Sequence, residues 1–247
     1  MPGGSPAITA AVFRAVRTGN AFEETVERLL EGVKLGVYAP GDRLPPEREL
    51  TRRLGVSRIT LREALRELAA AGYVETKRGR FGGTFIIRQP EPMVPDELTA
   101  AARDMASGLD DALTFRRVVE TGAADMAARA SLSQQQRESL AECLAGMADA
   151  GSFGYRQADT RLHLAIADAA GSPLLTASVV EARVRLVDLL NAIPMLETNL
   201  EHANLQHARI VRAILAGDPE HARQAMQEHV AGTAALLRGF LGDVLDS

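Results

Sequence analysis

Two helical patterns separated by a tight turn, within residues 46–72, are the strongest constraint on how this chain can fold. The first, PERELTRRL, stops at Gly55, and the second starts at Ser57, a good helix N-cap, and runs through RITLREALRELAAA to Gly72. Another helical pattern, over 21–36, precedes them, and two short extended pieces, YVETK and GTFIIR, follow around RGRFGG. Three helices followed by a hairpin predict a winged helix-turn-helix.

The chemistry of this segment suits nucleic acid. In a helix-turn-helix, the N-terminal end of the second helix reaches base edges in the major groove. Arginine suits bidentate contact with guanine, hydroxyl groups suit phosphates or bases, and glycine lets a hairpin backbone approach the duplex closely. A solvated helix face balanced by glutamates is the plain alternative, but the order of the elements favours DNA. The residues predicted to contact DNA are Arg48, Ser57, Arg58, Thr60, Arg62, Lys77, Arg78, Gly79 and Arg80.

A proline-rich stretch and a charge asymmetry divide the chain in two. RQPEPMVPDE, at 88–97, holds three prolines and is a poor helix but a good linker. Residues 1–88 carry 15 basic and 10 acidic side chains, whereas the remainder carries 13 and 22 together with all five histidines. We therefore predict an N-terminal extension at 1–20, a DNA-binding domain at 21–88, a linker at 89–96 and a second domain at 97–247.

The second part is predicted to consist of helices alone. Ser133 with Gln136 makes a capping box, and Ser172–Pro173 and Asp218–Pro219 are further helix starts. Together with helical patterns near 97–108, 110–129, 155–170 and 198–216, these signals give six or seven helices and no credible strand. The predicted fold class is mainly α, a winged helix-turn-helix followed by an antiparallel helical bundle.

Polar side chains interrupt the apolar faces of three of these helices. His207 and His229 each lie in line with apolar residues at helical spacing, and His163 borders an apolar stripe one turn after Asp159. A lone inward histidine is usually a hydrogen-bonded core residue. Three imidazoles and a carboxylate in one small bundle are costly to bury without partners, and a shared metal ion removes that cost.

An Asp/His₃ set predicts a divalent metal ion, with Zn²⁺ as first choice and Ni²⁺, Mn²⁺ or Fe²⁺ possible when water completes the shell. The remaining histidines, His202 and His221, lie near helix starts and are predicted to face solvent. The single cysteine, Cys143, cannot form an intramolecular disulfide and reads as a small core residue. This cysteine usage, with neither an apolar signal segment nor a spanning helix, predicts a cytoplasmic protein without membrane association.

The motifs GDRLPPERELTRRLGVSRITLREALREL, GYV and RGRFGGTFI closely resemble the DNA-binding domain of bacterial transcription regulators of the GntR family, over about residues 21–88. By that resemblance, Arg48, Ser57, Arg58, Thr60, Arg62 and the wing around Gly79 contact DNA, in agreement with the residues selected from their chemistry.

Residues 97–245 resemble the FCD ligand-binding domain of the FadR subfamily within this family. The motifs are Arg116 with Glu120, Asp159 with His163, and one histidine in each of the last two helices. The resemblance implies that Asp159, His163, His207 and His229 hold a cation that helps to bind a small carboxylate effector. Arg116 is the first candidate for an arginine that helps to bind this effector, and Arg185 is the second. The alternative for Arg116 is an ion pair with Glu120 within the same helix. Gln206 stands where the family often has an acid, a departure that changes the surroundings of the predicted ligands but not the ligand set.

The chain is thus predicted to be a DNA-binding transcription regulator, usually a repressor in this family and not an enzyme. A homodimer would read a palindromic operator in double-stranded DNA, and a small organic acid would modulate this binding. One alternative is a regulator for which the metal ion itself is the effector, but the soft thiolates common in such sensors are missing. The other alternative is an enzyme, either a metal hydrolase or a di-metal oxidase, fused to a DNA-binding domain. However, no inward-facing general base accompanies Asp159, and one aspartate is too few for a di-iron site.

Overall fold

A computed structural model describes residues 5–15, 21–79, 82–88, 100, 108–149, 151–192 and 197–245. The chain forms two compact units, Met1–Glu91 and Pro92–Ser247, which are considered separately. The predicted DNA contact Arg80, the linker at 89–96 and nearly all of the helix expected near 97–108 lie outside the described residues. No helix among the described residues combines the length and the apolar character that crossing a membrane requires.

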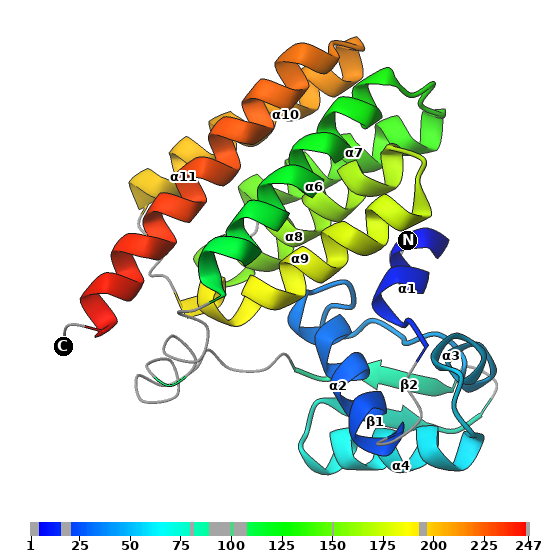
Figure 1. Ribbon diagram of the computed structural model, residues 1–247. Helices are drawn as coiled ribbons and strands as arrows, with labels where there is room; N and C mark the ends of the chain where they lie inside the picture. Colours follow the sequence, from blue (N-terminus) through cyan, green and yellow to red (C-terminus); the bar gives the residue numbers. More distant parts are fainter. Residues whose placement is uncertain are drawn as a thin grey trace. The chain divides into compact units, whose positions relative to one another are not determined.

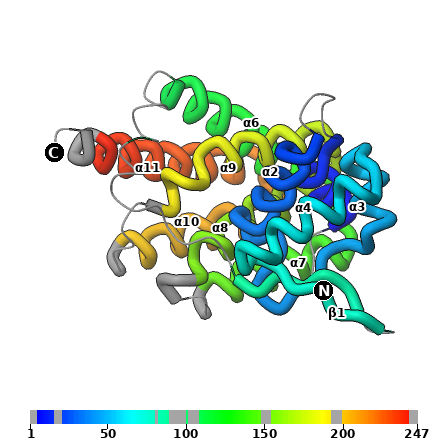
Figure 2. The backbone as a smooth tube through the Cα atoms, turned by 90° about the horizontal axis from the view of Figure 1, so that it is seen from below, coloured from blue at the N-terminus to red at the C-terminus, as the bar shows by residue number. Residues whose placement is uncertain are grey.

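The N-terminal unit contains the predicted winged helix-turn-helix. Its elements are α1 (Pro6–Val12), α2 (Ala21–Lys34), α3 (Glu47–Leu54), α4 (Arg58–Ala70) and the antiparallel strands β1 (Val74–Lys77) and β2 (Gly83–Ile86). Figure 2 shows α2, α3 and α4 as one blue-to-cyan cluster from which the hairpin extends. Gly55 ends α3 with a φ of 69°, and Ser57 Oγ caps α4 by accepting from the Thr60 amide at 3.0 Å. Leucines from α3 and α4 fill the core.

Helix α1 lies in the N-terminal extension, for which the sequence analysis assigned no structure. Phe13, directly after α1, stacks on Tyr38 with ring centroids 5.7 Å apart, and the hydroxyl groups of Thr9 and Tyr38 lie 3.3 Å apart. Gly32 in α2 permits this packing, because a Cβ there would lie 3.1 Å from Val12 Cγ1. The described part of the extension is therefore packed on the DNA-binding domain.

The C-terminal unit is a bundle whose described elements are helices only. These are α6 (Leu109–Arg129), α7 (Gln134–Asp149), α8 (Gly151–Ala169), α9 (Pro173–Ala192), α10 (Glu197–Ala216) and α11 (Pro219–Leu245). Helix α6 packs against α8, α9, α10 and α11, so the last helix of the chain lies along the first of this bundle (Figure 1). The mainly α fold class predicted from the sequence is confirmed.

The predicted capping box at the start of α7 is present. Ser133 Oγ accepts from the Gln136 amide, and the Gln136 side chain accepts from the Ser133 amide at 2.9 Å. We expect Ser133→Ala to lower the free energy of unfolding by about 1 kcal/mol, because it removes a partner from the first turn. Urea denaturation checks this, with Ser131→Ala, an exposed serine in the same loop, as the control. Equal effects of the two changes would contradict the role of the cap.

Candidate functional site

Three helices bring the four predicted metal ligands together inside the C-terminal unit. Asp159 and His163 project from α8, His207 from α10 and His229 from α11, and all four side chains are buried. One donor atom from each residue lies within 4.8 Å of the other three. His229 Nε2 lies 3.3 Å from His163 Nε2 and 3.2 Å from His207 Nε2, and Asp159 Oδ1 lies 3.2 Å from His207 Nε2. Three ring nitrogens and one carboxylate oxygen therefore converge on one point.

These separations fit a divalent cation. Four ligands bound tetrahedrally at roughly 2.0–2.1 Å are separated from one another by roughly 3.3 Å, close to the distances from His229 Nε2 to the Nε2 atoms of His163 and His207. Burial, followed by the neighbouring imidazoles, holds the pKa of His229 well below its ordinary value, and burial lowers the pKa of His163. Both rings are therefore neutral at pH 7, the form in which histidine binds metal.

The outer nitrogens of two of these imidazoles lie close to fixed acceptors. His163 Nδ1 lies 3.0 Å from Glu120 Oε2, and His229 Nδ1 lies 3.1 Å from Gln206 Oε1. A proton on each Nδ1 would leave the Nε2 lone pairs facing the centre, an arrangement typical of metal-binding histidines. Gln206 therefore supplies an acceptor oxygen to a predicted ligand.

A buried ionic network surrounds the cluster. Arg183 from α9 donates to Asp159 Oδ2, to Thr160 Oγ1 at 3.1 Å and to Glu120 Oε1 at 3.0 Å, and Arg116 Nε lies 3.3 Å from Glu120 Oε2. Burial alone would raise the pKa of Glu120, but the guanidinium of Arg116, the hydrogen bond with His163 and the guanidinium of Arg183 outweigh it and hold the pKa well below its ordinary value. Burial likewise opposes ionisation of Asp159, and Arg183 and the histidines hold its pKa well below normal. Both carboxylates are therefore ionised at neutral pH.

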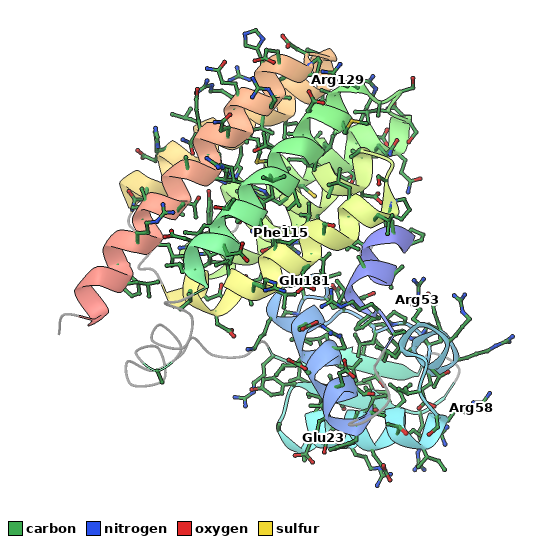
Figure 3. All side chains as sticks on the ribbon, in the orientation of Figure 1. Glu23, Arg53, Arg58, Phe115, Arg129 and Glu181 are labelled. Atoms are coloured by element: carbon green, nitrogen blue, oxygen red, sulfur yellow. The ribbon has the colours of Figure 1, made fainter. Side chains whose placement is uncertain are left out.

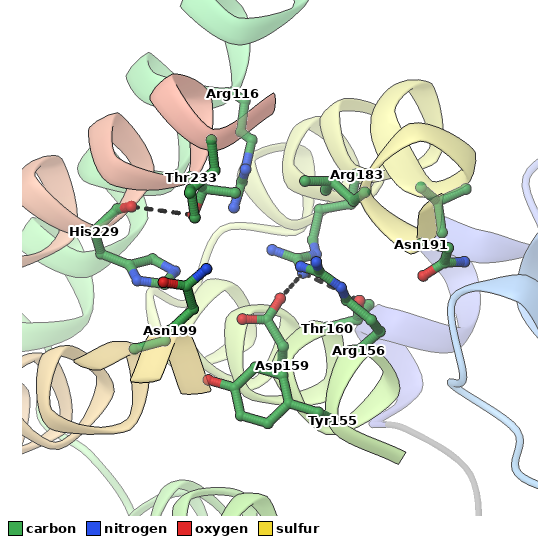
Figure 4. A pocket seen from close by; sticks show the side chains of 14 residues that line it. Arg116, Tyr155, Arg156, Asp159, Thr160, Arg183, Asn191, Asn199, His229 and Thr233 are labelled. Atoms are coloured by element: carbon green, nitrogen blue, oxygen red, sulfur yellow. Dashed lines mark hydrogen bonds and ion pairs between the residues drawn. The ribbon is translucent and has the colours of Figure 1, made fainter. Parts of the chain in front are cut away.

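A cavity of about 60 Å³ adjoins the cluster (Figure 4). Arginines, amides and hydroxyl groups line it together with a few apolar side chains. The polar lining residues are Arg116, Tyr155, Arg156, Asp159, Thr160, Arg183, Asn191, Asn199, His229 and Thr233, and the apolar ones include Val187, Leu190 and Leu236.

The two arginines predicted from the sequence to assist an effector lie in different places. Arg116 is 2% exposed and lines the cavity while it also pairs with Glu120, so the intrahelical pair leaves this side chain at the cavity wall. Arg185 is not brought to the cavity, because its side chain is 55% exposed on α9 and pairs with Glu181 at 3.0 Å. Arg183, two residues earlier, occupies the buried face, and sequence reasoning missed it. The signal was present, since Arg183 lies at helical spacing with the apolar residues Val179 and Leu186.

The predicted DNA-contacting residues gather at the surface of the N-terminal unit. Arg48, Ser57, Arg58, Arg62, Arg78 and Gly79 are exposed and Thr60 is half-buried. Arg58 is the first residue of α4 and points away from the unit in Figure 3. Arg62 Nε pairs with Glu47 Oε2 at 2.9 Å, which ties α4 to α3, and Gly79 has a φ of 107° in the hairpin turn. The arginine-bearing N-terminal end of α4 is therefore exposed on this unit, as the predicted DNA contact requires.

Comparison with known proteins agrees with this architecture. Residues 22–86 match the family model for bacterial regulatory proteins of the gntR family, and residues 111–232 match the FCD domain. The chain is 32% identical over 229 residues to RmpR of Mycobacterium gastri, named as an HTH-type transcriptional regulator, covering 89% of this chain and 81% of that protein. It is 28% identical over 215 residues to the HTH-type transcriptional regulator LutR of Bacillus subtilis, covering 84% and 97% of the two chains.

A solved structure described as McbR/YncC of Escherichia coli has a similar fold, with a TM-score of 0.54 and 20% identity over 90% of this chain and 99% of that one. The gntR family model describes regulatory proteins, and the two related proteins are named as transcription regulators, not enzymes. The chain therefore belongs to the GntR family of bacterial transcription regulators, with an FCD domain at its C-terminal end.

Proposed function

We propose that this DNA-binding regulator acts as a homodimeric repressor whose operator affinity is modulated by a small carboxylate effector bound beside a divalent metal ion. One observation carries the proposal: three imidazole nitrogens and a carboxylate oxygen converge next to a cavity lined by three arginines. The imidazole nitrogens and the ionised Asp159 suit a cation, and the arginines suit an anion.

Asp159, His163, His207 and His229 would hold the ion, with Zn²⁺ as first choice and Ni²⁺, Mn²⁺ or Fe²⁺ as alternatives. When bound, the ion supplies a positive centre that attracts carboxylate or hydroxyl oxygens of the effector. Arg183 fixes the second oxygen of Asp159, which leaves Oδ1 facing the histidines. Arg116 lies at the cavity wall and stays the first arginine partner proposed for the effector, and Arg183 replaces Arg185 as the second.

The effector can change DNA binding only through its different affinities for two states of the protein. A two-fold dimer matches a palindromic operator, in which two copies of α4 would occupy successive major grooves. Helices α6, α8 and α9 all contribute to the ionic network, so an anion that engages Arg116 or Arg183 perturbs contacts between these helices. We infer that this repacking is the path by which the effector changes the spacing of the DNA-binding domains.

Fluorescence anisotropy with DNA from upstream of the protein's own gene tests the proposal, and footprinting locates the site. We expect a two-fold symmetric footprint and weaker binding when an organic acid is added at a fixed metal concentration. Absence of specific DNA binding, with or without metal, would overturn the proposed operator. If the metal alone switches DNA binding and no acid has any effect, the ion is the effector and the carboxylate role is wrong.

The exposed N-terminal residue of α4 provides a direct test of the DNA-binding face. We expect Arg58→Ala to weaken specific operator binding by about 1–3 kcal/mol, because it removes a base or phosphate contact. Arg129→Ala, which removes the same charge from an exposed position in the other unit, is the control. The two variants are compared in the same anisotropy titration, and equal operator affinities would remove Arg58 from the interface.

A further inference from the structure

We propose that the effector is a short dicarboxylate, with one carboxylate at the metal cluster and the other held near Arg156. This inference rests on the proposed function and specifies the chemical class of its ligand. Arg156 is a half-buried residue on α8 that lines the cavity. It is not among the effector-binding residues predicted from the sequence.

The charges around the cavity favour a dianion over a monoanion. Arg116, Arg156 and Arg183 contribute three positive charges, whereas Asp159 and Glu120 contribute two negative ones. A divalent ion in the cluster would add its own positive charge and make the site strongly positive. A monocarboxylate would leave most of this charge uncompensated in a largely buried place, which is costly, and a second carboxylate on the same molecule reduces that cost.

The hydrogen-bonding capacity of the lining leads to the same conclusion. Arg116 Nη1, Arg183 Nε and the Tyr155 hydroxyl are buried and have no hydrogen-bond partner among the described residues. All three residues line the cavity, and in Figure 4 the Arg116 side chain reaches into it beside Thr233. Buried donors without acceptors are rare in folded proteins, so a ligand rich in acceptor oxygens would satisfy this wall.

The lining has two polar ends. Figure 4 shows His229 and Asn199 on one side of the cavity and Arg156, Thr160 and Asn191 on the other. A carboxylate beside His229 lies next to the metal cluster, whereas one beside Arg156 meets a guanidinium and an amide. The cavity volume of about 60 Å³ is small beside ligand pockets of roughly 300–1,000 Å³, so only a short carbon frame can separate the two carboxylates.

L-malate and L-lactate make a matched pair of probes, since both are 2-hydroxy acids and only malate carries a second carboxylate. In calorimetric titrations of the metal-loaded full chain, we expect malate to bind at least about tenfold more tightly than lactate. Lactate binding as tightly as malate would overturn the dicarboxylate assignment and leave the proposed function standing. Failure of both acids to bind would overturn the carboxylate-effector part of the proposed function, and the present inference with it.

A charge-removing variant locates the second carboxylate. Arg156→Gln should reduce malate affinity at least about tenfold and leave lactate affinity nearly unchanged, so the preference for malate disappears. Arg161→Gln, at an exposed position on the same helix, is the control and should keep the preference. An equal loss of malate and lactate affinity in Arg156→Gln would contradict a role for Arg156 in holding the second carboxylate. Circular dichroism establishes that each variant is folded.

Discussion

A His207→Ala variant is expected to lose its bound divalent metal, with affinity falling by at least about 100-fold. His207 is fully buried and its Nε2 lies 3.2 Å from both His229 Nε2 and Asp159 Oδ1, so its removal opens one side of the cluster. Loss of a residue that only orients a ligand already costs about 10–100-fold in metal affinity, and loss of a ligand costs more. Elemental analysis of protein purified without chelators measures the effect directly.

The chain offers a matched control for this experiment on the same helix. His202 also lies on α10 but is exposed, so His202→Ala should retain about one ion per chain. His221→Ala makes the same comparison on α11. Full metal occupancy in His207→Ala, or an equal loss in the two exposed variants, would show that the ion binds elsewhere.

The second large effect is expected in the metal-free protein, where Arg183→Met should lower the free energy of unfolding by about 3–5 kcal/mol. Arg183 is buried and donates to Asp159, Thr160 and Glu120, which are also buried. Methionine fills similar space but leaves the carboxylate of Asp159 without its cationic partner. Removal of one member of a buried ion pair costs several kcal/mol for this reason. Urea denaturation in the presence of a chelator gives the value.

Arg185→Met serves as the control, two residues along the same helix. Its exposed pair with Glu181 should contribute about 0–1 kcal/mol, because solvent screens such pairs. If the two variants unfold at the same urea concentration, the buried network does not stabilise the fold as argued.

The sequence was sufficient to predict the elements that depend on local chemistry. Gly55, Ser57 and the Ser133–Gln136 box lie where helices end or begin, and caps can be recognised from a few adjacent residues. The inward-facing positions of His207 and His229 could be predicted for a similar reason, since each histidine interrupts an apolar helical face. Residues from α8, α10 and α11 could therefore be assigned to one cluster before their distances were known.

Arg185 was selected from the sequence and Arg183 was missed, although Arg183 lies at helical spacing with Val179 and Leu186. The two residues lie on different faces of α9, and which face is buried depends on how α9 packs against α6 and α8. The packing of α1 could not be predicted from the sequence either. It depends on the stacking of Phe13 on Tyr38 and on the close approach of Val12 to Gly32. These features are set by contacts between segments distant in sequence, which local patterns do not encode.

The most direct test of the central claim measures the operator affinity of the metal-loaded protein by fluorescence anisotropy. The measurement is made with and without one acid, either L-malate or L-lactate, whichever binds the protein more tightly. Wild-type protein should lose about 5–150-fold in operator affinity when the acid is saturating, the range typical of allosteric coupling. His207→Ala should bind the operator but show no response to the acid. An equal response in both proteins, or no response in the wild type, would contradict the proposal that an acid bound beside the metal controls DNA binding.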